Sequence, residues 1–325
     1  MDTKYRKSRA AMISVISNTA LVLMKLIVGL LIGSVSVISE AIHSGFDLLA
    51  AVIALFSVRT SSRPADSDHP FGHGKIENVS GAIEALLIFL AAGWIIFEAV
   101  KKFLYPEPME AANWGVGVMF ISTVVNIFVA QMLFKVGKET DSVALQADAW
   151  HLRTDVYTSV GVMVGLALIW LGQWLIPNYN LIWLDPLCAI AVALLIVKAA
   201  YELTIQSARD LLDVHLPADE EASIRNLIEA DRDTIRGYHY LRTRKAGHYR
   251  FIDFHIQVDS MMTVEASHSL TGKLSKAINE RLPHSTVMIH IEPCMGECSK
   301  RCLTGCLLRQ TGKLRGQDGT LSPFA

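Results

Sequence analysis

The sequence predicts a membrane protein in three parts: an all-α bundle of six transmembrane helices (1–206), a cytoplasmic α+β domain of ferredoxin-like type (207–293), and a flexible cysteine-containing tail (294–325). Apolar residues make up 51% of the chain and concentrate in long runs between about positions 11 and 206. A bilayer core of ~30 Å requires ~20 apolar residues per helix, and six runs meet that length. Beyond position 206 the chain becomes charged and mixed, as expected of a soluble domain.

Composition excludes two broad classes of protein. With 19% charged residues and a formal net charge of −1, the chain is neither a disordered polymer nor a basic nucleic-acid binder, and we expect no nucleic-acid partner. Five cysteines, four of them after position 293, do not form the framework of a disulfide-rich domain.

Six apolar runs define the expected spans, and polar or helix-breaking residues separate them. The first run follows a basic segment, but it is too long for a signal peptide and no small-residue cleavage site follows it. Turns are expected at Gly33-Ser34, at Pro106 with Pro108, and at Pro177 with Asn178. The expected spans are 11–32, 35–59, 79–104, 113–135, 143–172 and 182–206.

Lysine and arginine positions predict the orientation of these spans. Positive charge marks the N-terminal segment and every second connection, which places both termini in the cytoplasm. Lys101 and Lys102, near the outer end of the third span, can extend to the headgroups. The positive connections are 59–78 and 135–142, and the others are 33–34, 105–112 and 173–181.

Two identical pairs of ionisable residues lie near the middle of the second and fifth spans. His43 with Asp47, and His151 with Asp155, each form an H-x-x-x-D motif, whose spacing places both side chains on one face of a helix. The two spans run in opposite directions, so these faces can meet and offer two imidazoles and two carboxylates, a set suited to tetrahedral Zn²⁺. An Asp at the membrane centre costs ~2.5–3.5 kcal/mol, and a bound cation removes most of that cost. We therefore predict a shared metal site, to which the family resemblance described below assigns the transport role.

Each pair alone could instead be a hydrogen bond between packed helices, and the repetition of the motif favours the metal site. The same nitrogen and oxygen ligands also accept Cd²⁺, Co²⁺, Fe²⁺ and Mn²⁺, whereas Mg²⁺ and Ca²⁺ prefer oxygen alone. Other intramembrane polar residues could line a water-filled cavity or hold helices together. They are Asn18, Glu40, Glu84, Glu98 and Asn126.

The polar loop after the second span contains another candidate metal site. His69 and His73 have the spacing of ligands, Asp66 could complete the site, and two glycines allow the loop to close around an ion. Asp68 competes with Asp66 as the carboxylate. A polar turn with incidental histidines is the alternative.

The pattern after position 206 predicts the order helix, strand, strand, helix, strand, which is typical of a ferredoxin-like sandwich. Residues 251–258 alternate apolar and polar side chains, as a half-buried strand does. The predicted elements are a helix over 217–230, strands over 237–245 and 249–258, a helix over 264–282 and a strand over 285–292.

Four histidines and a carboxylate in this domain predict a regulatory metal site. His290 and Glu292 share one face of a strand, because residues i and i+2 point the same way. The full set is His239, His255, His268, His290 and Glu292, while His215, His248 and His284 are interpreted as surface residues.

Four cysteines recur at every fourth position after the last predicted strand: Cys294, Cys298, Cys302 and Cys306. Thiolates bind zinc strongly, and a reducing cytoplasm keeps them free of disulfides. A dynamic, metal-capturing tail is the preferred interpretation, with redox sensing and disorder as the alternatives.

Together, the six spans, the paired H-x-x-x-D motifs, the D-x-x-H-x-x-x-H-G-K loop and the ferredoxin-like domain resemble the cation diffusion facilitator family over nearly all of residues 8–293. The resemblance implies export of divalent cations, chiefly Zn²⁺, in exchange for protons, by a homodimer that alternates access across the lipid bilayer of a bacterial inner (plasma) membrane. It also implies a salt-bridge latch between subunits, formed by Lys75 and Asp213. The histidine set of the cytoplasmic domain resembles a binuclear metal cluster of the family, in which Glu292 occupies a position where Asp is usual.

Three other functions are weighed against this one. An Fe²⁺ or Mn²⁺ exporter of the same family is the first alternative, because ligand type alone does not decide between transition metals. A non-transporting membrane metal sensor or partner subunit is an alternative of another class, although all four transport ligands are present. An intramembrane metalloprotease would need an H-E-x-x-H motif, which the sequence lacks, so a secondary transporter without catalytic residues is expected.

Overall fold

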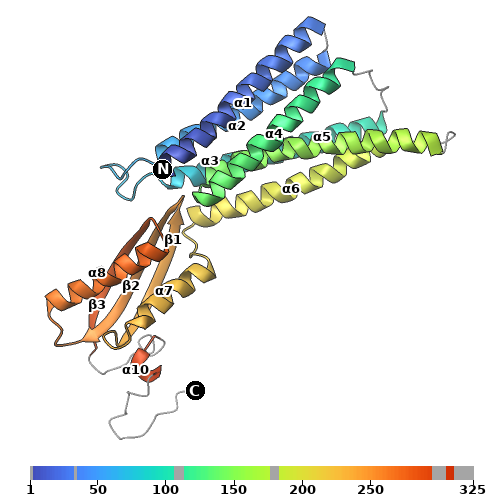
Figure 1. Cartoon of the computed structure of the whole chain (residues 1–325). Coiled ribbons are helices and arrows are strands. Elements are labelled where there is room, and N and C mark those ends of the chain that lie inside the picture. Colours follow the sequence, from blue (N-terminus) through green and yellow to red (C-terminus); the bar gives the residue numbers. More distant parts are fainter. Residues whose placement is uncertain (1–2, 33–34, 106–112, 176–182, 295–304, 311–325) are drawn as a thin grey trace. The chain divides into compact units, whose positions relative to one another are not determined.

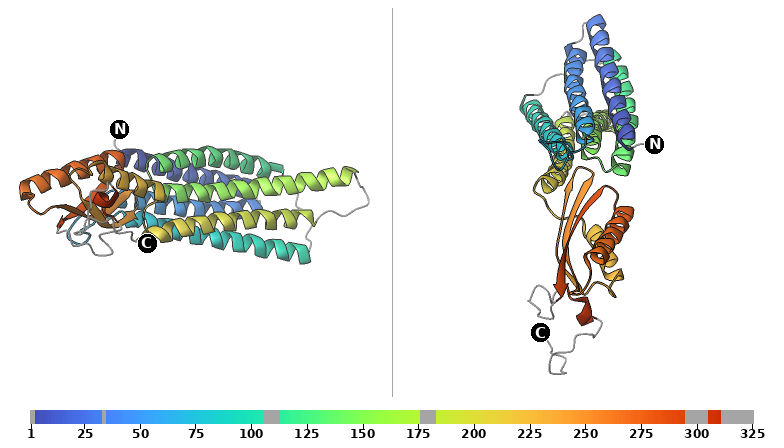
Figure 2. Two further views of the ribbon diagram at one scale, coloured as in Figure 1. Left: turned by 90° about the horizontal axis from the view of Figure 1, so that it is seen from below. Right: turned by 90° about the vertical axis from the view of Figure 1, so that its left-hand side faces the viewer.

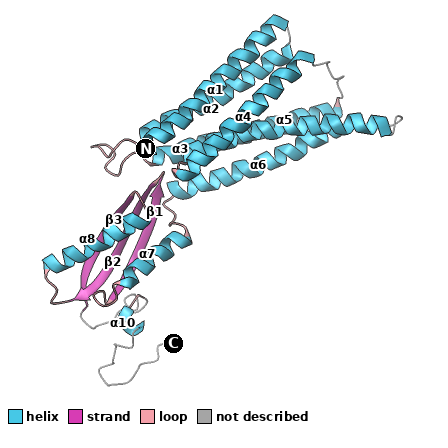
Figure 3. Ribbon diagram, in the orientation of Figure 1, coloured by secondary structure: helices cyan, strands magenta, loops and turns pink. Residues whose placement is uncertain are grey.

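The structure is a computed structural model that describes residues 3–32, 35–105, 113–175, 183–294 and 305–310. It divides into two compact units, Met1–Leu211 and Leu212–Ala325, and each is described by itself. Among the described residues, the first unit is helical and all strands lie in the second (Figure 3).

Among the residues that the structure describes, six long helices build the first unit, as predicted. Figure 1 shows that α1, α2 and α4 diverge from α3, α5 and α6 with increasing distance from the N-terminal end of α1, and Figure 2 shows the same helices from two further directions. All but α5 contain a described stretch that is long and apolar enough to cross a membrane. The helices are α1 (Thr3–Ile32), α2 (Val35–Ser61), α3 (Lys75–Leu104), α4 (Asn113–Glu139), α5 (Val143–Leu175) and α6 (Leu184–Leu211).

Small residues lie where these helices meet, and large apolar residues face outward. Ala50, Ala51 and Ala54 of α2 are fully buried, whereas Phe56 and Trp94 are each 66% exposed. Small residues let helix backbones approach closely, and lipid is as apolar as the outward-facing side chains. This distribution is that of a membrane protein.

Several helices extend beyond the apolar runs that predicted them. α1 begins at Thr3 rather than 11, and α3 begins at Lys75 rather than 79. Hydropathy marks only the part of a helix that matches the bilayer core, and the polar turns at its ends continue the helix. The turns expected at Gly33-Ser34, Pro106 and Pro177 lie outside the described residues.

A buried ion pair ties helices together near the N-terminal end of α1. Lys7 of α1 donates to Glu77 of α3 at 3.1 Å, and the side chains are only 1% and 0% exposed. The same carboxylate accepts hydrogen bonds from Ser61 of α2 at 2.7 Å and from Ser142, just before α5, at 2.5 Å. One carboxylate thus joins α1, α2, α3 and the chain leading into α5.

The second unit has the predicted order α-β-β-α-β. The sheet order is β1-β2-β3, with β1 antiparallel and β3 parallel to β2. α7 and α8 pack on one face of the sheet (Figure 2, right). The elements are α7 (Ala218–Ala230), β1 (Gly237–Ala246), β2 (Tyr249–Asp259), α8 (Val264–Arg281) and β3 (Ser285–Cys294), followed by the short α10 (Leu307–Gln310).

The alternation along β2 decides what each face of the sheet carries. Ile252, Phe254 and Ile256 are buried in the core formed with α7 and α8. The side chains between them, Asp253 and His255, therefore point to the opposite face. That face presents His239, His255 and His290, three of the four histidines of the predicted regulatory site.

One histidine interpreted as a surface residue is buried. His248, in the turn between β1 and β2, is 7% exposed, and its ring centroid lies 4.1 Å from that of Tyr249 and 5.2 Å from that of His284. The surface interpretation of His248 was wrong, because the fold brings His284, which is distant in the sequence, against its ring on the side not taken by the adjacent Tyr249.

Candidate metal centres

The two H-x-x-x-D motifs meet where α2 packs against α5 inside the first unit. The Nε2 atom of His151 lies 3.1 Å from Oδ1 of Asp47, and the Nε2 atom of His43 lies 4.0 Å from Oδ1 of Asp155. The helices run in opposite directions (Figure 1), so the shared four-residue spacing sets each imidazole opposite the carboxylate of the other helix.

These four side chains line a cavity of about 720 Å³. His43, Asp47 and Asp155 each offer one ligand atom within 4.8 Å of the others. Asp47 and His151 are nearly buried, whereas the side chain of His43 is 55% exposed. His151 is not part of this group of three and joins it through its contact with Asp47. Two nitrogens and two carboxylates lining one cavity are a ligand set that suits a four-coordinate divalent ion.

A lysine that the sequence analysis did not single out lines the same cavity. Lys25 of α1 is 6% exposed, and its Nζ donates to the hydroxyl of Ser44, the residue after His43, at 2.7 Å. Asn126, one of the polar residues left open by the sequence, also lines the cavity. A charged residue in the middle of an apolar run is the signal that could have found Lys25.

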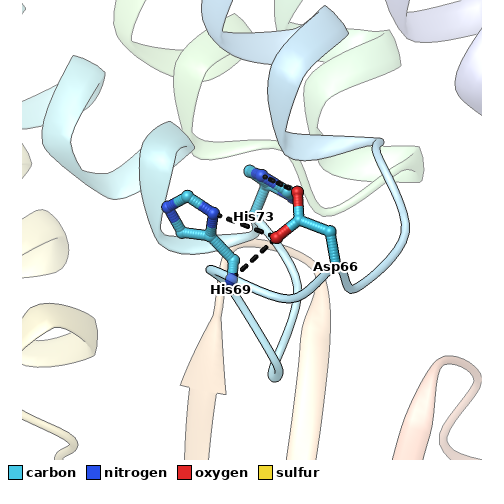
Figure 4. Close-up of side chains that lie close together, drawn as sticks. All are labelled: Asp66, His69 and His73. Carbon is cyan, nitrogen blue, oxygen red and sulfur yellow. Dashed lines mark hydrogen bonds and ion pairs between the residues drawn. The ribbon is translucent and has the colours of Figure 1, made fainter.

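The loop between α2 and α3 gathers its three predicted ligands (Figure 4). Asp66 Oδ1 accepts a hydrogen bond from the backbone N–H of His69 at 2.7 Å and lies 3.3 Å from its Nδ1. Asp66 Oδ2 lies 3.3 Å from Nε2 of His73. Gly72 has a φ of +82°, a conformation that glycine adopts readily, and it turns the chain so that both rings face the carboxylate.

Asp66, rather than Asp68, is the carboxylate that faces the two histidines. Asp68 contributes its backbone N–H to Asp66 at 3.1 Å. The hydrogen bond from the backbone of His69, with further contributions from the side chains of His69 and His73, holds the pKa of Asp66 below its usual value. A carboxyl group that stays ionised is prepared to bind a cation.

Three histidines form a row across the sheet of the second unit. His239 on β1 is paired in register with His255 on β2, which is paired with His290 on β3. Glu292 contacts all three: its carboxylate oxygens lie 2.8 Å from Nδ1 of His255, 3.3 Å from Nε2 of His239 and 3.9 Å from Nε2 of His290. Within one chain these four of the five predicted residues come together.

His268 lies apart from this cluster within a single chain. It is exposed on α8, whose Leu270 and Leu274 pack on the other face of the sheet. The sheet therefore separates the imidazole of His268 from Glu292.

Two family models match almost the whole folded part of the chain. "Cation efflux transmembrane domain" matches residues 11–212, and "Cation efflux protein, cytoplasmic domain" matches residues 216–294. The chain is a member of the cation diffusion facilitator family. The resemblance inferred from the motifs is confirmed, and this facilitator is a membrane transporter for the efflux of divalent metal cations rather than an enzyme.

Relatives of this facilitator match it over most of their length. The chain is 38% identical over 261 residues to an uncharacterized transporter of Synechocystis sp., with 80% of this chain and 82% of the relative covered. It is 32% identical over 287 residues to the cation-efflux pump FieF of Cronobacter sakazakii, covering 88% and 93%, and 31% identical to FieF of Yersinia pestis, covering 90% and 96%. A solved structure of CzrB in its zinc form is 34% identical over 27% of this chain and 99% of that chain, with a TM-score of 0.25.

The predicted latch residues of this facilitator have partners within their own units. Lys75 donates to the backbone carbonyl of Leu211 at 3.4 Å, and Asp213 accepts from Arg244 at 3.5 Å. Lys75 belongs to the first unit and Asp213 to the second, so the latch between subunits stays a prediction.

Part of the cysteine-containing segment packs on the domain instead of forming a free tail. Cys306 is 6% exposed and makes an isolated antiparallel bridge with Gly237 of β1, and Leu307 joins the hydrophobic core. At Gly305 the chain passes so close to β1 that a Cβ atom would lie 1.6 Å from the carbonyl oxygen of Tyr238. Residues 305–310 thus differ from the expected flexible tail, because Leu307 gains burial only when this segment docks.

The other cysteines leave the four-sulfur site untested. Cys294 ends β3, is partly exposed and lies in register with Asp259 of β2. Cys298 and Cys302 lie outside the described residues, so a metal site made of all four thiolates stays a prediction.

Proposed function

We propose that this facilitator exports Zn²⁺ in exchange for protons, with His43, Asp47, His151 and Asp155 holding the ion during transport. The observation that carries the proposal is the meeting of two imidazoles and two carboxylates at one cavity within a membrane bundle. Nitrogen with carboxylate oxygen is a ligand set that suits Zn²⁺, and it disfavours Mg²⁺ and Ca²⁺.

The pairing of each histidine with a carboxylate supplies the exchange chemistry. Imidazole gains and loses a proton near neutral pH, and a metal ion binds only the unprotonated nitrogen. Zn²⁺ arriving at His151 must therefore displace any proton shared with Asp47, and the same holds for His43 and Asp155. A proton returning from the other side of the membrane restores the pair and releases the ion. Metal and proton compete for the same atoms, which couples their movements.

The second unit serves in this proposal as the cytoplasmic dimer contact and metal sensor. The description of its matching family model as a cytoplasmic domain supports this placement, which puts both termini in the cytoplasm of a homodimer. Zn²⁺ or Cd²⁺ bound by Glu292 and the three histidines around it would link all three strands. His239 Nδ1 is buried and has no hydrogen bond among the described residues. Together with the carboxylate of Glu292 and the other two imidazoles, it gives a set of ligand atoms that fits an ion.

Transport in reconstituted vesicles tests the assignment of the transport site. Vesicles with a pH gradient and an internal zinc-sensitive dye are compared for the wild type, for Asp155→Ala, and for Glu202→Ala as the control. Glu202 pairs only loosely with Lys198 on the exposed side of α6, at 3.9 Å. We expect Asp155→Ala to lower proton-driven uptake by at least about tenfold and Glu202→Ala to leave it unchanged. Normal uptake by Asp155→Ala would remove the assigned site.

Metal identity is decided in the same vesicles by comparing Zn²⁺, Cd²⁺, Fe²⁺ and Mn²⁺. Saturable Zn²⁺ flux supports the proposal. Fe²⁺ or Mn²⁺ flux without Zn²⁺ flux would instead make the protein an exporter of those metals. Metal binding without flux of any ion would make it a sensor or partner subunit.

A further inference from the structure

Two carboxyl groups lie fully buried beside the transport ligands, but they do not line the cavity. Glu84 of α3 and Asp148 of α5 are both 0% exposed, and the described residues that line the cavity include His151 but neither acid. Asp148 lies three residues before His151, and Glu84 lies nine residues after the start of α3. Both acids therefore lie on the side of the transport site where α1, α3 and α5 begin.

The oxygens of these two acids have almost no partners among the described residues. Glu84 Oε1 accepts a hydrogen bond from Ser80 at 3.2 Å, whereas Glu84 Oε2 and both oxygens of Asp148 accept none. Ser14 of α1 lies near Asp148 without reaching hydrogen-bond geometry. Burying a carboxylate without a donor is costly, so such a group is kept only where it binds a proton or a cation.

His151 connects this acid pair to the transport site. Its Nε2 faces Asp47, while its Nδ1 is buried and has no hydrogen bond among the described residues. Glu84 and Asp148 lie within electrostatic range of His151 and of each other. The two nitrogens of an imidazole point in different directions, so one ring has one nitrogen at the transport ligands and the other on the side away from Asp47.

We infer that Glu84 and Asp148 form a second cation station, which receives a divalent transition-metal ion from the cytoplasm before the ion moves to the transport ligands. The inference rests on the proposed transport function and its orientation. The cavity extends in the opposite direction, to Trp94 and Thr158, which lie further along α3 and α5 than Glu84 and His151. An ion that approaches from the side where α1, α3 and α5 begin therefore meets Glu84 and Asp148 before it meets His151.

The small number of protein ligands in the station agrees with a role in passage rather than storage, because two carboxylates face an ion there whereas the transport site offers four side chains. An ion held there by two carboxylates and water is bound more weakly than at the four transport ligands, so it can move on to them.

The test measures Zn²⁺ uptake as a function of Zn²⁺ concentration in vesicles of the full-length protein. Glu84→Gln keeps the size of the side chain and removes its charge, and Glu84→Asp keeps the charge. Glu98→Gln, on the same helix and partly exposed, is the matched control. We expect Glu84→Gln to raise the KM for Zn²⁺ by about tenfold with little change in the maximal rate, Glu84→Asp to restore most of the loss, and Glu98→Gln to behave as the wild type.

An unchanged KM in Glu84→Gln, or an Asp variant as impaired as the Gln variant, would overturn the station, because a charged ligand would then not be required. If Glu84→Gln does not yield folded protein, Asp148→Asn is measured in the same way with the same expectation. If the wild type does not transport Zn²⁺, the proposed function is refuted. If the wild type transports Zn²⁺ but Glu84→Gln leaves the KM unchanged, only the station is refuted, so the two failures are distinguishable.

Discussion

The buried carboxylate of Glu77 provides a sharp test of how the first unit is stabilised. Glu77→Ala leaves the ammonium of Lys7 buried at 1% exposure and removes the acceptor of Ser61 and Ser142. Breaking a buried ion pair on one side costs about 3–5 kcal/mol. For a unit of this size each kcal/mol lowers the melting temperature by about 2–4 °C, so we expect a decrease of about 6–20 °C.

The exposed ion pair between Arg6 of α1 and Glu139 of α4 offers a matched control, because its basic partner is the residue next to Lys7. Its side chains are 40% and 41% exposed, so Glu139→Ala is expected to cost less than about 1 kcal/mol. Thermal unfolding of the purified variants in detergent, followed by size-exclusion chromatography, measures both. Equal melting temperatures for Glu77→Ala and Glu139→Ala would refute the reasoning, since burial would then not decide the strength of these pairs.

Three further predictions concern the loop, the C-terminal segment and the sheet cluster. The pKa of Asp66 is lower in the folded loop than in the unfolded chain, so its contribution to stability is complete above the unfolded pKa of about 4 and is lost as the pH falls through the folded pKa. NMR measurements of the order of this loop against pH should show the loss. The variant Asp66→Asn should remove the pH dependence. Gly305→Ala places a Cβ 1.6 Å from the backbone of β1 and should undock the segment, so that Cys306 reacts faster with a thiol reagent, whereas Gly272→Ala, with open space around it, should not change this rate. Glu292→Gln should weaken zinc binding at the sheet cluster by about tenfold or more in a competition titration against a chelating dye, and unchanged affinity would exclude the carboxylate as a ligand.

Local patterns in the sequence were sufficient for the elements and for the ligands that share one element. Hydropathy over runs of about 20 residues predicts the helices, since each helix must match the bilayer by itself. The alternation along 251–258 predicts which side chains of β2 leave the core, and a four-residue spacing predicts that His43 and Asp47 share a helix face. The domain order and the family followed from these short-range regularities.

Contacts between elements were decided by the tertiary structure alone, because they depend on which faces meet and at what depth. The pairing of His151 with Asp47 requires the register of α2 against α5, and the burial of Lys7 with Glu77 requires that α1 and α3 begin at the same level. His268 shows the same dependence on packing. Its nearness in sequence to the other histidines assigns it to the cluster around Glu292, but within one chain the sheet lies between His268 and that cluster. A sequence states which side chains a face carries, and only packing determines what that face touches.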